Sequence, residues 1–540
     1  MMNAARSTTV SEMEEEINNL SFTSHLSVAF GPAAYVETMA MAENEEQFPP
    51  MEELSPEDAS PTEEETTAEI AIRFIRTGFP LTLASLSIFS YNTVIIACVG
   101  SMLGEAELGA VSLALGLLNA TGFAFGAGLC GALETVLSHC YGSHKREFDE
   151  QQAKRAAYVA AHPDEVVPEV VEGPLYLYGI YAQRMGLILL GIAVPLGIVV
   201  AFIDSIMNAL GGNPVIVYYT GQWCHIALFG VPIALYQQLL HRYYSCQHMT
   251  VPPSVAMVGG ALLNPVLQFT CIRLFGFHGS AIGWLLLILI VNGSLTLYIS
   301  KSGLYKKTWN GFSGEATRNV GKLFCIALPS LGVMLSEWVA LEINALAGGF
   351  ADTVDLAAFS ISLQVFGIMF GVGAGVMIMT CVFVGNAIGS GKPLLARKTA
   401  FIAIGLVVCI SFVDIALAYL LSPFIPRLFS DSAEVAEVYH DLMKVVLPYH
   451  TLDIFQSTVM GVLRGCGLQK IGAVIISIAF CVVGVPLSFL LFFYFDYGII
   501  SLWIGPATGA VFVGLPSYAF LLLYYIDWAN LKPVEEDAEG

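Results

Sequence analysis

The chain has 540 residues, of which 56% are hydrophobic and only 12% are charged. Soluble domains are roughly 45–50% apolar and about 25% charged, so this composition excludes an ordinary soluble protein and predicts a helical integral membrane protein. The net charge of −21 comes mainly from residues 1–69, which hold sixteen acidic residues against one arginine. No basic patch suggests a nucleic-acid partner.

Residues 1–70 form a tail rich in Glu, Ser, Thr and Pro, as in "PPMEELSPEDASPTEEETT". Low hydrophobicity with high charge predicts a disordered acidic segment in the cytosol. It lacks the basic region followed by an apolar core that marks a signal peptide. A shorter cytosolic tail is expected over residues 529–540.

The eleven cysteines form no CxxC motif and no Cys/His cluster, and no HExxH or GxSxG motif occurs. These absences argue against a zinc site, a disulfide framework and a serine nucleophile. We therefore expect no metal, no cofactor and no enzymatic activity.

Twelve apolar segments follow the tail, each long enough to cross a hydrocarbon core about 30 Å thick. We expect an N-lobe over residues 71–310 and a C-lobe over residues 311–528, with six spans each. The predicted spans are 78–99, 108–137, 177–203, 217–240, 253–273, 279–300, 320–347, 355–384, 399–421, 440–463, 470–494 and 499–526.

The orientation follows from the lysines and arginines, which favour cytosolic loops. With the N-terminus in the cytosol, twenty of these residues fall on the cytosolic side, and only Arg273, Arg427 and Lys444 fall on the other. An even number of spans places both termini in the cytosol. The charged segment 144–175 lies between the second and third spans, and we expect a solvated cytosolic loop there rather than a short amphipathic helix.

The two halves of the chain resemble each other. The second span begins "LGAVSLAL" at residues 108–115, and the eighth begins "LAAFSISL" at residues 356–363, an offset of 248. Both continue through glycine-rich stretches and end before a basic loop. Parallel repeats of this kind are typical of transporters that bind substrate between two lobes.

The seventh span carries two acids, Glu337 and Glu342, in "SLGVMLSEWVALEINALAGG". A charge at the centre of a membrane helix costs roughly 2.5–3.5 kcal/mol, so such acids usually face a cavity and mark a path for ions or substrate. The two acids lie about 140° apart on a helix, whereas Asn344 shares the face of Glu337. We expect Glu337 and Asn344 to face one cavity, and Glu342 to face its edge or a neighbouring helix.

The tenth span adds His450 and Asp453, which lie one helical turn apart, and Gln456 continues the same face. We expect the histidine to tune the carboxyl group of Asp453. Three other acids carry weaker signals. Glu134 and Asp204 lie near helix ends, where snorkelling or capping would suffice, and Asp414 is interpreted as a helix-packing residue.

The segment "GNAIGSGKP" at residues 385–393 resembles a phosphate-binding loop only in composition. The spacing is wrong, and Pro393 stands where a Ser or Thr would bind magnesium.

Several segments resemble the multidrug and toxic compound extrusion (MATE) family, in its animal and plant branch, over residues 72–528. They are "ETVLSHCYGSHK", "TWNGFS", "LPSLGVMLSEWVALEI", "VGNAIGSGKPLLARK" and "GVLRGCGLQKIGA". The resemblance implies an all-α membrane protein with twelve transmembrane helices in two pseudo-symmetric six-helix lobes, which alternate between inward-facing and outward-facing states. It also implies that Glu337, Glu342, Asp453 and His450 couple transport to a proton or cation.

The substrate cavity is then expected to include Asn92, Trp338, Asn344, Gln364 and Gln456. Two of these residues depart from the family pattern. Many bacterial members carry an Asp where this chain has Asn92, and animal members carry a Glu where it has Gln364. These departures place coupling in the C-lobe and make neutral or anionic metabolites plausible substrates beside organic cations.

We therefore interpret the chain as a secondary antiporter that exports organic cations, drugs or metabolites in exchange for protons. The alternatives are a sodium-coupled exporter of the same family and a lipid-linked flippase of the same superfamily. The expected partners are a small-molecule substrate, protons and the lipid bilayer, with no nucleic acid. A monomer in the plasma membrane or in a vacuolar or endosomal membrane is expected.

Overall fold

The computed structural model describes residues 66–163, 168–209, 211, 213–429 and 432–534. Nearly all of the predicted acidic tail and the last residues of the C-terminal tail lie outside this part of the chain. Within it, all regular secondary structure is helical, as predicted.

The helical elements follow one another through short connections, with η marking 3-10 or π segments. In chain order they are α4 (Thr67–Met102), α5 (Glu105–Leu118), η2 (Asn119–Phe123), α6 (Ala124–Ala161), α7 (Tyr176–Ala201), α8 (Ile203–Ala209), α9 (Pro214–Ala227), η3 (Leu228–Gly230), α10 (Val231–Ser245), α11 (Val251–Phe275), α12 (His278–Ser302), α13 (Leu304–Thr308), η4 (Gly314–Thr317), α14 (Val320–Gly348), α15 (Thr353–Gly389), α16 (Pro393–Leu421), η5 (Pro426–Leu428), α17 (Ala433–Gly465), α18 (Gln469–Ser477), η6 (Ile478–Gly484), α19 (Val485–Phe489), η7 (Leu490–Tyr494), α20 (Ser501–Gly509), η8 (Ala510–Gly514), α21 (Leu515–Phe520) and η9 (Leu521–Tyr525).

Each of the twelve predicted spans corresponds to one helical rod. Among the described residues, ten helices are long and apolar enough by themselves to cross a membrane. The remaining two predicted spans correspond to the rod α5–η2–α6 and to α17. Both rods contain more polar residues than the others, because they carry Glu134, Asp453 and Arg464 toward the interior of the bundle.

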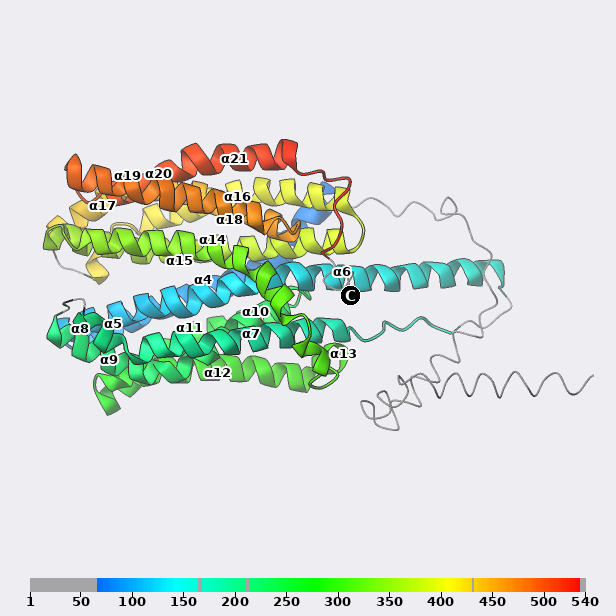
Figure 1. Cartoon of the computed structure of the whole chain (residues 1–540), viewed down its shortest axis with the longest axis horizontal. Helices are drawn as coiled ribbons and strands as arrows, with labels where there is room; N and C mark the ends of the chain where they lie inside the picture. The colour runs from blue at the N-terminus through cyan, green and yellow to red at the C-terminus, as the bar shows by residue number, and fades with distance from the viewer. Residues whose placement is uncertain (1–65, 164–167, 210, 212, 430–431, 535–540) are drawn as a thin grey trace, which may run out of the picture. The chain divides into compact units, whose positions relative to one another are not determined.

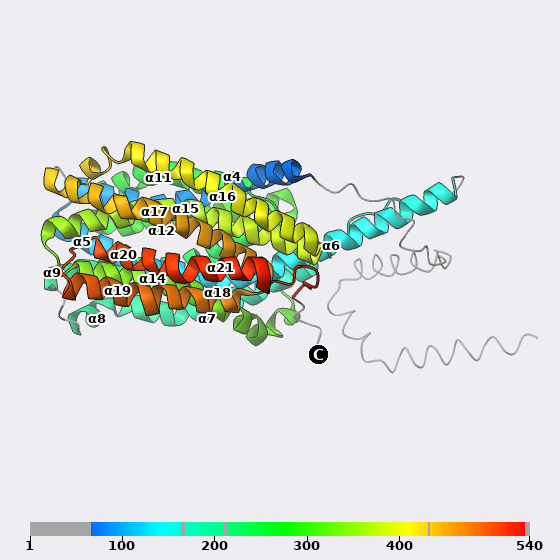
Figure 2. The same ribbon diagram turned by 90° about the horizontal axis from the view of Figure 1, so that it is seen from above.

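The rods run side by side along the long axis of the bundle (Figures 1 and 2). One end, here called the basic end, is where α4 and α16 begin and where α6 projects beyond the bundle. Arg73, Lys145 and Lys392 lie at this end, since Arg73 is near the start of α4, Lys392 directly precedes α16, and all three line one pocket. At the opposite end, α5, α9 and α15 begin.

The charged segment after the second span differs from the prediction. Residues 144–161 continue helix α6 instead of forming a loop. The stretch "EFDEQQAKRAAYVAA" consists largely of strong helix formers, and Arg146 pairs with Glu150 one turn later, with 3.6 Å between Nε and Oε1. Local propensity is therefore enough to extend the helix beyond the bundle.

Two buried hydrophobic clusters divide the bundle. One is built mainly from α4 to α12 and includes Trp223 and Trp284. The other is built mainly from α14 to α21 and includes Phe359 and Trp503. These clusters agree with two repeated halves, while the exact lobe boundaries stay a prediction.

Helix α15 packs against α4, α6 and α17 at the junction of the halves. It is the most buried of the apolar helices, with 83% of its most apolar window inside the bundle. A Cβ atom at Gly375 would lie only 2.5 Å from the Thr82 Cα atom of α4. Small residues at such crossings let membrane helices approach closely, so the glycine-rich sequence of α15 fixes how the halves meet.

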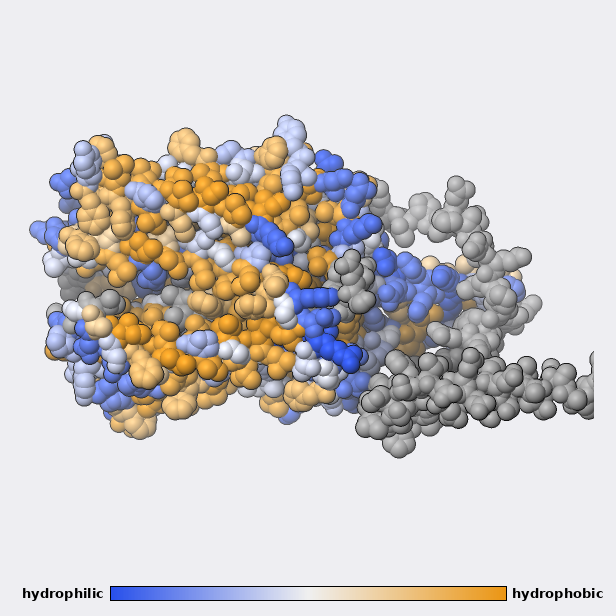
Figure 3. Space-filling view, viewed as in Figure 1, coloured by the Kyte–Doolittle hydropathy of each residue, from blue (hydrophilic) through white to orange (hydrophobic). Residues whose placement is uncertain are grey.

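The surface carries a broad apolar belt. Hydrophobic side chains cover the middle of the bundle, and hydrophilic ones gather toward the two ends (Figure 3). Large hydrophobic residues are strongly exposed on this belt, with Leu190 at 62%, Leu262 at 76% and Phe412 at 65%. In water such a surface would be unfavourable, so the chain is a multi-pass membrane protein whose belt faces lipid.

Candidate substrate and coupling site

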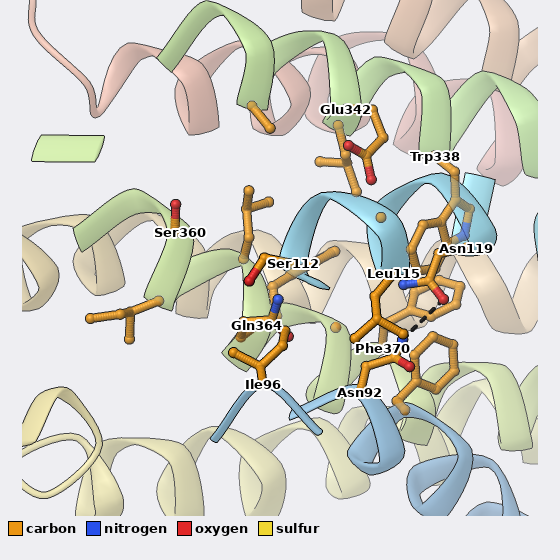
Figure 4. Close-up of a pocket in the computed structure, with 18 of the residues that line it drawn as sticks. Asn92, Ile96, Ser112, Leu115, Asn119, Trp338, Glu342, Ser360, Gln364 and Phe370 are labelled. Atoms are coloured by element: carbon orange, nitrogen blue, oxygen red, sulfur yellow. Dashed lines mark hydrogen bonds between the residues drawn. The ribbon is translucent and has the colours of Figure 1, made fainter. Parts of the chain in front are cut away.

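A cavity of about 330 Å³ lies between the two halves. Its walls come from α4, from the rod α5–η2, and from α14 and α15, and Figure 4 shows their side chains converging on one space. Phe429 also lines it, from the connection before α17 at the end opposite the basic end. The cavity therefore lies toward that opposite end.

The sequence repeat is visible in this cavity. Ser112 and Ser360 are 248 residues apart and both line it, and so do Gly116 and Gln364 at the same offset. The two repeats thus contribute equivalent helix faces to one site, as the parallel repeat predicts.

The polar wall on the first half is held by a side-chain hydrogen bond. Asn92 Nδ2 of α4 donates to Asn119 Oδ1, 3.0 Å away (Figure 4). Asn119 begins η2, a π-helical turn inside the second rod. Such turns are often found at functional sites because they re-aim side chains. Sequence analysis identified Asn92 but missed Asn119, because a π turn has no clear sequence signature.

Four aromatic rings from both halves form a cluster beside the cavity. Trp338 stacks on Phe89 with 6.0 Å between ring centroids, and it meets Phe123 and Phe370 edge-on at 5.8 Å and 5.6 Å. The cluster closes the cavity on one side with well-packed apolar surface.

Helix α14 presents two different faces. Trp338 and Glu342 line the cavity, whereas Asn344 donates from Nδ2 to the Leu502 carbonyl oxygen at 2.8 Å and is fully buried. The structure therefore corrects the expectation for Asn344, which packs against α19 and α20 instead of sharing the cavity with Glu337. Gln456 also lies outside the cavity lining. Glu342 lines the cavity, in agreement with the place expected for it at the edge of that space.

Glu337 borders the cavity and also reaches the interior of the second half. Its carboxyl group is buried, and so is the neighbouring carboxyl group of Asp453 on α17. Neither oxygen of Asp453, nor Oε1 of Glu337, has a hydrogen-bond partner in the described part of the chain. Buried acids without donors are costly to keep charged, so such a pair marks a candidate place for a proton or a small cation.

The surroundings of the pair are polar but incompletely bonded. The hydroxyl groups of Tyr449 and Tyr518 and the Oε1 atom of Gln456 are buried without a hydrogen-bond partner in the described part of the chain. Buried polar groups are normally satisfied by protein, water or ions. These unpartnered oxygen atoms are therefore available to bind a proton, a water molecule or a small cation.

His450 does not use Asp453 as its partner, contrary to the sequence-based expectation. Its Nε2–H donates to Asp414 Oδ2 of α16 at 2.7 Å. The ring is fully buried and the Asp414 side chain is 17% exposed. Although His450 and Asp453 share a helix face, the histidine side chain points toward α16. Asp414 therefore forms a hydrogen bond between packed helices, as the sequence suggested.

We expect His450→Ala and Asp414→Ala to lower stability through the same interaction. Each change removes one side of a buried hydrogen bond between α16 and α17, at a cost of roughly 1–3 kcal/mol. In a double-mutant cycle measured by unfolding in detergent, the two effects should couple by about 1 kcal/mol or more. Strictly additive effects would contradict the pairing.

A buried ion cluster closes the bundle between the cavity and the basic end. Glu134 of α6 is fully buried, not a capped helix end as expected from sequence. Arg242 of the same half donates from Nε to Glu134 Oε1 at 2.9 Å, and Arg464 of the other half donates from Nη1 to Oε2 at 3.4 Å. Its partners are 108 and 330 residues away in the sequence, which is why the sequence did not reveal it.

Backbone contacts continue this closure toward the basic end. Ser143 Oγ donates to the Gly389 carbonyl oxygen, and Ser390 Oγ donates to that of Gly142, both at 3.1 Å. His139 donates from Nε2 to the Gly465 carbonyl oxygen at 2.8 Å. The halves are thus joined at the basic end and part around the cavity.

The described residues form twelve helical rods in two repeats around one central cavity, which is the architecture of a membrane transporter. The family model MatE matches residues 80–162, 176–270 and 329–490, more than half of the chain. The chain therefore belongs to the MatE family, as the sequence motifs predict.

Curated relatives agree with this assignment. Multidrug and toxin extrusion protein 1 of Danio rerio is 27% identical over 460 residues, covering 85% of this chain and 72% of the relative. Its counterpart in Homo sapiens is 26% identical over 445 residues, covering 82% and 73%.

Solved structures support the fold. The eukaryotic MATE transporter AtDTX14 superposes with a TM-score of 0.75 at 20% identity, over 86% of this chain and 97% of its own. An outward-facing MATE family transporter of the MOP superfamily superposes with a TM-score of 0.67 at 18% identity, over 84% and 95%.

Proposed function

We propose that the chain is a monomeric antiporter that exports small organic cations, drugs or metabolites in exchange for protons, by alternating access. The observation that carries this proposal is the burial of two neighbouring carboxyl groups, Glu337 and Asp453, beside the cavity. The pair borders the cavity through Glu337, and gain or loss of a proton there changes the charge buried between α14 and α17 and thereby the balance between conformations.

The orientation proposed from sequence assigns the basic end to the cytosol, with both termini there. The described conformation then corresponds to an outward-facing state, since the cavity lies toward the other end and the ion cluster at Glu134 closes the cytosolic side. The plasma membrane and a vacuolar or endosomal membrane are both compatible with this orientation.

The cavity lining supports an organic substrate with a positive or neutral polar group. Glu342 supplies a carboxylate, Trp338 and Phe370 supply aromatic surface, and Gln364 supplies a neutral amide. Cations are attracted both by carboxylates and by aromatic faces. The described lining residues include no lysine or arginine, so the cavity does not suit the phosphates of a lipid-linked flippase substrate.

Sodium is the second candidate for the coupling ion. The unsatisfied oxygens of Asp453, Gln456, Tyr449 and Tyr518 are the ligand type that a small hard cation needs. A sodium ion bound among them would neutralise the interior of the second half much as a proton does.

The test is uptake of labelled organic cations and neutral drugs into vesicles that contain the purified protein, without sodium and over a range of imposed pH differences. We expect flux to rise with the pH difference in this sodium-free medium. Flux that ignores the pH difference and follows a sodium gradient instead would replace the proton by sodium as the coupling ion. Flux independent of both gradients would contradict antiport.

A further inference from the structure

A second pocket, of about 350 Å³, lies at the basic end and shares no lining residue with the central cavity. Arg73 of α4 and Lys145 of α6 contribute from the first half, and Ser390 and Lys392, between α15 and α16, contribute from the second. The transport mechanism proposed above does not use this pocket.

The pocket is electropositive. Arg73, Lys145 and Lys392 line it together with one acid, Asp149. The Arg73 guanidinium lies over the Phe383 ring at 5.3 Å, which fixes it at the pocket wall. Three cations against one carboxylate give an excess of positive charge between two sets of helices, and such a concave site concentrates anions.

The wall also offers hydrogen-bonding groups. Thr77, Tyr141 and Thr399 line the pocket, and the 29-residue helix α16 begins there at Pro393 with no side-chain cap. Helix N-termini favour anions because their first N–H groups point outward along the dipole. Asn386, also in the wall, leaves its Oδ1 without a partner among the described residues, so the wall has unused polar capacity.

We propose that this pocket binds the phosphate group of an anionic ligand, either a phosphate-bearing lipid headgroup or a free phosphate ester. Lysine and arginine side chains beside a helix N-terminus form the usual environment for phosphate, and basic pockets between membrane helices bind lipid headgroups. The segment "GNAIGSGKP" supplies Asn386, Ser390 and Lys392 to it, without forming the nucleotide loop that its composition suggests.

The neighbouring surface allows a lipid to occupy the pocket. On α4, Ile72 is 65% exposed, Ile75 is 51% exposed and Phe79 is 62% exposed, and Leu394 at the start of α16 is 65% exposed. Acyl chains can lie along these residues while the headgroup reaches the cations.

The bound anion also acts on the conformational equilibrium. Lys145 belongs to the first half and Lys392 precedes α16 in the second, and one phosphate held between them joins the halves at the basic end. A ligand shifts an equilibrium toward the state it binds more tightly, so this anion favours the state with a closed basic end. This inference goes beyond the proposed transport function, and it does not depend on which substrate or ion is transported.

The experiment measures binding of the purified full-length chain to two probes. The first is a lipid nanodisc of phosphatidylcholine with or without a phosphoinositide, and the second is a soluble inositol phosphate. The test variant is Lys145→Gln with Lys392→Gln. The matched control is Lys301→Gln with Lys306→Gln, which removes two exposed lysines at the same end that do not line the pocket.

We expect the pocket variant to bind a phosphate-bearing probe roughly thirtyfold more weakly than the unmodified chain, because each lysine adds a severalfold attraction to an anionic surface. The control variant should change binding by less than about threefold. Lysine-dependent binding to the phosphoinositide alone assigns a lipid, and equal binding to the soluble probe assigns a free phosphate ester. If neither probe binds, or if both variants lose binding equally, the proposal is wrong.

Discussion

Replacing Glu337 by glutamine should reduce uphill transport driven by a pH difference to near background. Glutamine keeps the shape of the side chain, so the local packing survives while the exchangeable proton is lost. Stability should change by no more than about 1 kcal/mol, because the volume of the side chain is conserved and no charge is introduced. The reciprocal change, Asp453→Asn, should have the same effect for the same reason.

Exchange of labelled for unlabelled substrate at equal pH separates coupling from structure. Glu337→Gln should retain this exchange, since the cavity wall formed by Glu342, Trp338 and Gln364 is intact.

Glu342→Gln is the informative contrast. It should weaken binding of organic cations and leave transport of neutral substrates sensitive to the pH difference. Glu434→Gln, at an exposed acid near the start of α17, should be silent. Normal uphill transport in Glu337→Gln would overturn the coupling role.

The fold followed from the sequence because its causes are local. Length and apolar composition alone define a membrane-spanning rod, and the offset of 248 between equivalent serines indicated the repeat. Both predictions were confirmed, and the structure adds that Ser112 and Ser360 line one cavity. The extension of α6 has a local cause as well, but the sequence prediction did not include it. The high charge of this segment suggests a solvated loop, whereas the strong helix propensity of its residues determines the structure.

The site was only partly predictable, because helix periodicity gives relative angles and not absolute directions. Glu337 and Asn344 do share a face that is distinct from the face of Glu342. Which face meets the cavity depends on how α14 rotates against its neighbours, and that rotation is set by contacts with α19 and α20 far along the chain. For the same reason, the sequence did not predict that His450 bonds to Asp414 on α16 instead of Asp453, one turn away on its own helix.

The ion cluster at Glu134 is the clearest example of a feature that could not be predicted from the sequence. Burying two arginines and one glutamate costs several kcal/mol unless they pair, and the pairing requires both halves. A Cβ atom at Gly131 would lie 2.8 Å from Arg464 Cζ, so a larger residue there would force the guanidinium to shift from its place against the other half. Nothing local marks either the glycine or the acid as part of this contact.

Replacing Arg464 by glutamine should shift the protein toward the state in which the basic end is open. Arg242 and Glu134 belong to the same half and can stay paired in both states, whereas the bond from Arg464 to Glu134 exists only while the halves are closed. A hydrogen bond between charged groups contributes roughly 1.5–3 kcal/mol. Its loss should change the equilibrium by roughly ten- to a hundredfold.

Native cysteines can report this shift. Cys130 and Cys381 are fully buried near the closure, since Cys130 precedes Gly131 beside Arg464 and the Cys381 carbonyl oxygen lies against Gly465. Opening of the basic end should let a water-soluble maleimide reach them. We expect Arg464→Gln to accelerate their alkylation. Arg242→Gln is the matched control, because it removes an arginine of the same cluster within one half. It should lower stability without favouring the open state. Equal acceleration in both variants would reduce the cluster to a structural role.

We expect the same arginine to link the closure to the proton. Arg464 Nε and Nη2 lack acceptors among the described residues, and buried charges attract each other more strongly than charges in water. A negative charge on Glu337 should therefore draw Arg464 away from Glu134, whereas protonation of Glu337 should leave the arginine to the closure. Glu337→Gln, which mimics the protonated acid, should then slow alkylation of Cys130 and Cys381 relative to the unmodified chain. Faster alkylation would show that the proton acts on the halves by a route other than Arg464.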